Sequence, residues 1–265
     1  MLMRCFDVMR TTLYTAGLAL FFLLTPVAHS VAQTLSFTNA LACADLAVKR
    51  GDFQGALCIY DAATNAQAGN ATNLCTLARR YCDITYLTNS MSLRKEVMDR
   101  ALVCSQQAVT AAPTNAAAHA SLAVCYAKIC KFADVKTEMA DSRLLKLEAD
   151  KAIALDPNQD MAYYLLGRWN YGIARAGLLS RAYVKVVYGG LPHASLEDAA
   201  LDFQKACKLA PNSILNHAGL AMAYDALGEK KLEIAELEKC FTLKPLGPED
   251  TDALRDAKKK LATLN

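Results

Sequence analysis

One local pattern recurs along this 265-residue chain and restricts its fold more than any other feature. A small residue is followed five positions later by a proline in four segments: Ala108 to Pro113, Ala152 to Pro157, Ala206 to Pro211 and Cys240 to Pro245. A small residue lets two helices approach closely, and proline cannot continue a helix interior, so each segment predicts the end of a packed helix. Such recurrence indicates helical hairpins that stack on one another.

A second pattern begins nine residues after each of the first three prolines and combines a leucine, a small residue and an aromatic residue. Its three copies are Leu122, Ala123 and Tyr126; Leu166, Gly167, Trp169 and Tyr171; and Leu220, Ala221 and Tyr224. Leucine and tyrosine four positions apart lie on one face of a helix. Together the two patterns resemble the tetratricopeptide repeat, a helix-turn-helix unit of about 34 residues.

These repeats predict an all-α, tetratricopeptide-type solenoid of five helix pairs. The pairs are expected at about 38–68, 72–113, 115–157, 159–211 and 213–245. A closing helix at about 249–264, with lysines on its outer face, is expected to cap the apolar end of the stack. No strand pattern or low-complexity linker is present, so residues 33–265 are predicted to form a single domain.

The first 32 residues have the layout of a secretory signal peptide. Arg4 and Arg10 make the start positive, an uncharged, mostly apolar run extends from Leu13 to Leu24, and small residues lead up to Ala32. The run is shorter than the roughly 20 apolar residues that span a bilayer, so cleavage is preferred over an uncleaved membrane anchor. The expected location is secreted or periplasmic. The alternative is a protein anchored in an organelle membrane and facing the cytosol, where microtubules are possible partners.

Composition and motifs limit the chemistry of this chain. A formal net charge of +3 is too small to predict nucleic acid as a partner, and membrane contact is expected only through an uncleaved N-terminal segment. No Cys-x-x-Cys, His-x-x-x-His, Gly-x-Ser-x-Gly or phosphate-binding glycine pattern occurs, so no catalytic residue, metal or cofactor is expected. His119 and His217 lie where a large side chain normally packs, and Glu249 with Asp250 is typical of the charges that begin a helix.

Most of the cysteines lie among apolar residues, where they behave as small hydrophobic side chains. In an oxidising compartment, Cys43 and Cys58 would be the best candidate for a disulfide. They lie eight residues before and seven residues after Gly51, so a tight helical hairpin would bring the two positions level.

The two longest repeats permit a narrower comparison. The segment from Leu165 to Tyr171, LLGRWNY, is similar to a signature of the regulator of microtubule dynamics family, and the motifs that follow it agree in order and spacing. These motifs are Tyr188-Gly189, Ala194 to Ala199, Phe203, Lys205-Ala206, Pro211 and Tyr224 to Gly228. The resemblance covers about residues 96–263. It implies a repeat array behind an N-terminal hydrophobic segment, and a role at microtubules or organelle contacts that a cleaved, exported chain could not perform.

In this repeat class the first helix of each pair lines the concave face. The resemblance carries seven exposed positions onto that face: Lys128, Met161, Tyr164, Arg168, Tyr171, Met222 and Asp225. Arg168 is the strongest candidate for binding a partner, since its charge needs a carboxylate partner or solvent. The alternative is an internal salt bridge between Arg168 and an acid such as Asp225.

The main hypothesis is a non-enzymatic scaffold that holds a protein or peptide in its groove, and the alternative is a membrane-tethered protein of microtubules or organelle contacts. The insertion from Arg175 to Leu191 is predicted to fold back on the array, with a docking or membrane-contact surface as its alternative.

Overall fold

The computed structural model describes residues 36–131, 134–177, 182, 185–186 and 193–264, and within these ranges all regular structure is helical. The predicted signal peptide, residues 1–32, and most of the insertion lie outside the described residues. None of the helices found in the described ranges is long and apolar enough to cross a membrane.

The chain divides into two compact units, with the boundary between Gln67 and Ala68. The described part of the first unit is a hairpin of α2 (Phe37–Lys49) and α3 (Phe53–Ala66). Gly51 joins the two helices with a φ of 77°, a left-handed conformation that glycine adopts without steric cost. This confirms the hairpin predicted around Gly51, whereas the single domain predicted for residues 33–265 stays a prediction.

The disulfide considered for the first unit is not formed. Cys43 and Cys58 are free thiols with exposed side chains. Cys43 precedes the buried Ala44, and Cys58 follows the buried Leu57, so the rotation about each helix axis directs both thiols to solvent. Equal distance from the turn brings two positions level along a hairpin, but it does not decide the direction of their side chains.

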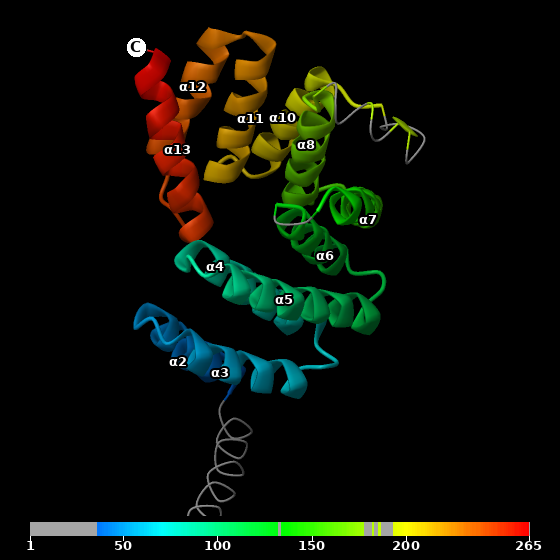
Figure 1. The fold of residues 1–265 in the computed structure, drawn as a ribbon, viewed down its shortest axis with the longest axis vertical. Helices are drawn as coiled ribbons and strands as arrows, with labels where there is room; N and C mark the ends of the chain where they lie inside the picture. The colour runs from blue at the N-terminus through cyan, green and yellow to red at the C-terminus, as the bar shows by residue number, and fades with distance from the viewer. Residues whose placement is uncertain (1–35, 132–133, 178–181, 183–184, 187–192, 265) are drawn as a thin grey trace, which may run out of the picture. The chain divides into compact units, whose positions relative to one another are not determined.

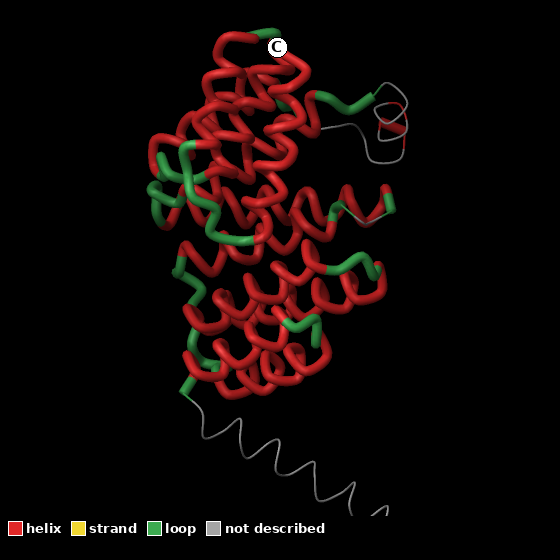
Figure 2. Tube along the Cα trace, turned by 90° about the vertical axis from the view of Figure 1, so that its left-hand side faces the viewer, coloured by secondary structure: helices red, strands yellow, loops and turns green. Residues whose placement is uncertain are grey.

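The second unit contains helix pairs followed by a closing helix (Figures 1 and 2). The pairs are α4 (Ala71–Leu87) with α5 (Met91–Ala111), α6 (Ala116–Ile129) with α7 (Val135–Leu155), α8 (Asp160–Ala174) with α10 (Leu196–Leu209), and α11 (Ile214–Leu227) with α12 (Lys230–Phe241). The closing helix is α13 (Pro248–Leu264). The helix bounds confirm the predicted pairs and the predicted closing helix to within a few residues.

The first helices of successive pairs form the inner layer of this unit. α4 packs against α6, α6 against α8, and α8 against α11, while α13 packs against α11 and α12. The first turns of α13 also return to α4, at the opposite end of the layer (Figure 1). The closing helix therefore caps the last pair and also spans the concave side, which the sequence did not predict.

Local side chains set where the repeat helices begin and end. Asn115 and Ser213, each two residues after a repeat proline, cap α6 and α11 by accepting a hydrogen bond from a backbone N–H of the first turn. Ser195 caps α10 in the same way by accepting from the N–H of Asp198 at 2.9 Å. At the end of α11, Gly228 has a φ of 78°, which is typical of a glycine that terminates a helix.

The main core of the second unit surrounds Phe203 on α10, whose side chain is fully buried. Gly167 on α8 and Gly219 on α11 face its ring so closely that a Cβ atom would lie 2.9 Å from the ring at Gly167 and 2.5 Å at Gly219. The ring of Tyr164 packs nearby, with 5.8 Å between ring centroids. The absence of side chains at the two glycines lets three helices meet at one aromatic ring, and this contact positions α8.

Candidate functional site

Two half-open cavities of about 380 and 460 Å³ lie along the inner layer of the second unit. The smaller one, the α13 cavity, is lined mainly by α8, α11 and α13, and the larger one, the α6–α8 cavity, by α6, α7 and α8. Five residues line both: Lys131, Tyr164, Arg168, Leu215 and Glu249. The cavities therefore adjoin at a junction that contains two cations, a phenol, an apolar side chain and one carboxylate.

Arg168 lies on α8 at this junction, with an exposed side chain. Among the described residues, no carboxylate lies within salt-bridge distance of its guanidinium, and the phenol of Tyr164 lies beside it. The internal salt bridge considered with Asp225 is not formed, because Asp225 instead contacts Nζ of Lys260 on α13 at 2.8 Å.

Lys131 follows α6 and brings a second unpaired cation to the junction. Its Nζ lies 5.7 Å from the ring centroid of Tyr86, and it makes no ion pair with any side chain in the described ranges. Although the side chain reaches solvent, the protein atoms around it partly desolvate the ammonium. This desolvation lowers the pKa of Lys131, and repulsion from Lys128 and Arg168 lowers it further. An anion bound at the junction would relieve that repulsion.

Lys128 lines the α6–α8 cavity, but it is not exposed there as the sequence predicted. It was expected to be exposed in the groove, but its side chain is buried, with 6% exposure for the residue. Its Nζ donates hydrogen bonds to the hydroxyl of Tyr86 at 2.7 Å and to Oε2 of Glu249 at 2.9 Å, and the Tyr86 hydroxyl donates to Oε1 of Glu249 at 2.5 Å. The prediction of exposure is wrong because the start of α13 returns to α4 and α6 and covers the ammonium.

We call Tyr86, Lys128 and Glu249 the closing cluster, since it joins α13 to α4 and α6. Burial by itself would lower the pKa of Lys128, but the negative charge of Glu249, together with Tyr86 and Cys82, outweighs burial and raises the pKa. Burial would likewise raise the pKa of Glu249, but Lys128, Tyr86 and Lys131 together lower it overall. Both groups are therefore charged near neutral pH, and each compensates the other.

The other predicted groove residues divide between the cavities and the core. Met161 lines the α6–α8 cavity, Met222 and Asp225 line the α13 cavity, and Tyr164 lines both although it is 8% exposed. Tyr171 lines neither cavity. The rotation of α8 directs the residues next to Tyr171 to the α6–α8 cavity and packs the ring of Tyr171 against the core. Sequence reasoning missed Tyr86, Lys131 and the role of Glu249, since these residues come together only through the return of α13.

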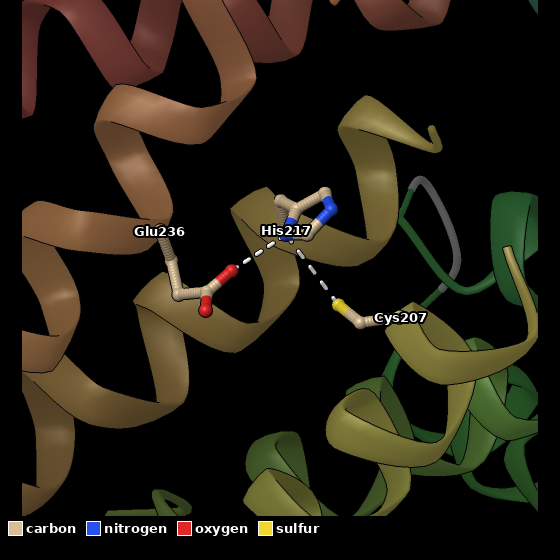
Figure 3. A group of neighbouring side chains, drawn as sticks. All are labelled: Cys207, His217 and Glu236. Atoms are coloured by element: carbon tan, nitrogen blue, oxygen red, sulfur yellow. Dashed lines mark hydrogen bonds and ion pairs between the residues drawn. The ribbon is translucent and has the colours of Figure 1, made fainter. Parts of the chain in front are cut away.

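One group of possible metal ligands occurs among the residues that the structure describes. It consists of Cys207, His217 and Glu236, whose ligand atoms all lie within 4.8 Å of one another (Figure 3). The three residues are on α10, α11 and α12 and line neither cavity.

Comparison with known proteins connects this geometry to a family. The family described as Regulator of microtubule dynamics protein 1-3 matches residues 40–265. Regulator of microtubule dynamics protein 2 of Mus musculus is 28% identical over 189 residues, which cover 71% of this chain and 46% of that protein. Regulator of microtubule dynamics protein 1 of Mus musculus is 30% identical over 158 residues, which cover 59% of this chain and 52% of that protein. The chain thus spans about half the length of these relatives.

A solved structure of similar fold is a thermophilic TPR protein from Thermus thermophilus. Its TM-score is 0.57 at 16% identity, and the similarity covers 86% of this chain and 100% of that chain. At this level of identity the likeness concerns the fold alone, and it confirms the tetratricopeptide-type architecture predicted from the repeats.

Proposed function

We propose, because this chain belongs to the regulator of microtubule dynamics family, that it is a non-enzymatic scaffold whose inner cavities bind an anionic segment of a protein partner. The observation that carries this proposal is the junction of the two cavities, where Arg168 and Lys131 lie together without a carboxylate partner among the described side chains. The non-enzymatic part of the proposal is supported by the family, whose description names regulators of microtubule dynamics, and by the TPR-type fold.

The chemistry of the junction favours a carboxylate over other groups. Arg168 offers a planar set of donors that can bind a carboxylate through two parallel hydrogen bonds. Tyr164 adds a phenol beside it, and Leu215 and Met161 add apolar surface to the lining of the cavities. A peptide whose acidic residue or free C-terminus reaches Arg168 would gain a charge-assisted contact and also reduce the repulsion among the neighbouring cations.

Arg168→Ala is expected to weaken binding of such a peptide by at least about 30-fold, since the loss of a central arginine in an interface costs about 2 kcal/mol or more. Peptides would be selected from a random library against the full chain, and the best binders measured by fluorescence anisotropy. The expected selection is for acidic side chains or for a free carboxyl terminus.

Arg79→Ala provides the matched control, because Arg79 is an exposed arginine on α4 that lines neither cavity. This variant is expected to bind the selected peptides as the wild type does. Equal affinity of the wild type and Arg168→Ala, or selection of peptides that carry no anionic group, would contradict the proposed site.

A second candidate function is a membrane-tethered protein that acts on microtubules or at organelle contacts, and the names of the relatives favour its microtubule part. The main candidate places the chain outside the cytosol after removal of residues 1–32, and the second requires that this segment be retained. Mass spectrometry of the native protein separates the two: a first residue near Gln33 supports export, and an intact N-terminus supports tethering. Co-sedimentation of the chain with assembled tubulin would test the second candidate directly.

A further inference from the structure

Three side chains from three helices converge beside the turn that precedes α11. Sγ of Cys207 lies 3.7 Å from Nδ1 of His217, and Oε2 of Glu236 lies 2.5 Å from the same nitrogen (Figure 3). His217 is 7% exposed, whereas Cys207 and Glu236 are half-buried, so the group can be reached from solvent. We propose that Cys207, His217 and Glu236 form a three-ligand site for Zn²⁺, with a fourth coordination position open to water or to an external ligand.

The chemical types of the three ligands favour zinc. Thiolate, imidazole and carboxylate are its usual protein ligands, and three protein ligands with one open position is a common zinc arrangement. The thiolate disfavours Mg²⁺ and Ca²⁺, which prefer oxygen ligands. This inference is independent of the proposed peptide site, because none of the three residues lines the cavities.

The orientation of His217 supports ligation through Nδ1. Its other ring nitrogen, Nε2, lies 2.9 Å from the carbonyl oxygen of Pro211 and can donate a hydrogen bond to it. A histidine that binds metal commonly donates its second ring N–H to such an acceptor, which fixes both the tautomer and the direction of the ring. Here the acceptor belongs to the repeat proline, so the turn between α10 and α11 holds Nδ1 toward Cys207 and Glu236.

Of the two distances to Nδ1 of His217, the one to Cys207 is close to that of a tetrahedral zinc site. Zinc bond lengths place a thiolate sulfur and an imidazole nitrogen about 3.6 Å apart, near the 3.7 Å between Cys207 and His217. They place nitrogen and carboxylate oxygen about 3.4 Å apart, so the carboxylate of Glu236 would retreat by about 0.9 Å from its present contact. Without metal, the proton of the hydrogen bond between His217 and Glu236 occupies this position. Zinc would displace that proton and the thiol proton of Cys207.

The same three residue types could suggest a nucleophile, a base and an orienting acid, but the geometry argues against that arrangement. A catalytic relay needs the nucleophile on one ring nitrogen of histidine and the acid on the other. Both Cys207 and Glu236 contact Nδ1 of His217, and Nε2 faces the carbonyl of Pro211. The three side chains point to one position rather than forming a chain of hydrogen bonds.

An earlier repeat contains the same arrangement without the thiol. Nε2 of His119 lies 2.8 Å from the carbonyl oxygen of Pro113, and its Nδ1 lies 2.5 Å from Oε2 of Glu148. The histidine–glutamate pair is therefore a structural feature of this repeat. Val109 stands ten residues before His119, at the position that Cys207 occupies ten residues before His217. A histidine–glutamate pair is thus present in both repeats, and in the later repeat Cys207 adds a third ligand to it.

Cys240 lies close to the group but is not one of its ligands. It is fully buried, and its thiol contacts the carbonyl oxygens of Glu236 at 3.3 Å and Ile214 at 3.7 Å. Its thiol is therefore directed to the backbone and not toward the other three side chains.

The experiment titrates the full chain, kept reduced, with Co²⁺ as a spectroscopic substitute and then with Zn²⁺. The wild type is expected to bind one Co²⁺ with a thiolate-to-cobalt charge-transfer band and the visible bands of tetrahedral Co²⁺, and Zn²⁺ is expected to displace it. Cys207→Val reproduces the residue of the earlier repeat and is expected to weaken Zn²⁺ binding by at least about 100-fold, because loss of a ligand exceeds the 10–100-fold typical of outer-shell changes. Cys58→Ser removes an exposed thiol on α3 and is expected to leave the affinity unchanged.

Equal affinity of Cys207→Val and the wild type, a cobalt spectrum without the thiolate band, or no binding by the wild type would each overturn the proposal. If Cys207→Val fails to fold, Glu236→Gln gives a second test, because Glu236 is half-buried and glutamine has nearly the same shape. Zn²⁺ is expected to raise the unfolding temperature of the wild type and to raise that of Glu236→Gln much less. An equal rise in both proteins would also overturn the site.

Discussion

Phe203→Ala is expected to lower the free energy of unfolding of the second unit by about 3–5 kcal/mol, the usual cost of deleting a buried aromatic ring. The ring is fully buried and fills the space between Gly167 on α8, Gly219 on α11 and the ring of Tyr164. Its loss leaves a cavity at the point where three helices meet, and the two glycines have no side chains to fill it. Urea denaturation followed by circular dichroism would measure the change.

A double-mutant cycle tests the close approach directly. Gly219→Ala alone is expected to cost about 1–3 kcal/mol, because its new Cβ would lie 2.5 Å from the ring of Phe203. In the Phe203→Ala background the clash is absent, and the higher helix propensity of alanine is expected to make the same change neutral or stabilising by up to about 1 kcal/mol. Gly172→Ala on α8 is the control, since nothing lies within 4 Å of its Cβ position. An equal cost of Gly219→Ala in both backgrounds would show that the ring and the glycine are not in contact.

Glu249→Ala is expected to destabilise the second unit by about 3 kcal/mol, at the lower end of the 3–5 kcal/mol lost when one partner of a buried ion pair is removed. The lower end applies because the side chain of Glu249 is 31% exposed, whereas that of Lys128 is only 8% exposed. The variant leaves the Lys128 ammonium buried with the Tyr86 hydroxyl as its neighbour. The contact of α13 with α4 should loosen, and hydrogen exchange should show faster amide exchange at the start of α13 and the end of α4.

Asp252→Asn is the matched control on the same helix. Asp252 pairs with Arg255 at 2.8 Å, and the side chains of Arg255 and Asp252 are 56% and 36% exposed, so the change is expected to alter stability by less than about 0.5 kcal/mol. Equal effects of Asp252→Asn and Glu249→Ala would contradict the proposed importance of the closing cluster.

The closing cluster also predicts how stability depends on pH. Glu249 has a folded-state pKa below its ordinary value of 4.5, so its contribution is present above that value and is lost as pH falls through the folded pKa. Lys128 has a folded-state pKa above its ordinary value of 10.5, so its contribution is present below that value and is lost as pH rises through the folded pKa. The stability difference between the wild type and Glu249→Ala should be constant from about pH 6 to 9 and should shrink in acid. A difference that shrinks instead between pH 6 and 9 would assign the effect to another group.

Local sequence was sufficient for the helices and for their pairing. A helix is specified by neighbours within a few residues, and the repeat prolines, the capping side chains of Asn115 and Ser213, and the glycine turns at Gly51 and Gly228 all act at that range. The order of motifs between Leu165 and Gly228 was enough to indicate the family.

Only the tertiary structure decided which charged side chains are available to a partner. The sequence assigned Lys128 and Arg168 to the same exposed face, but the return of α13 pairs Lys128 with Glu249, 121 residues away, and leaves Arg168 at the junction of the cavities. It likewise brought Cys207, His217 and Glu236 together at spacings that match no local metal motif. A helical period determines which residues share a face, but the contact of one helix with another depends on the rotation and path of both, and these follow from packing across the whole unit.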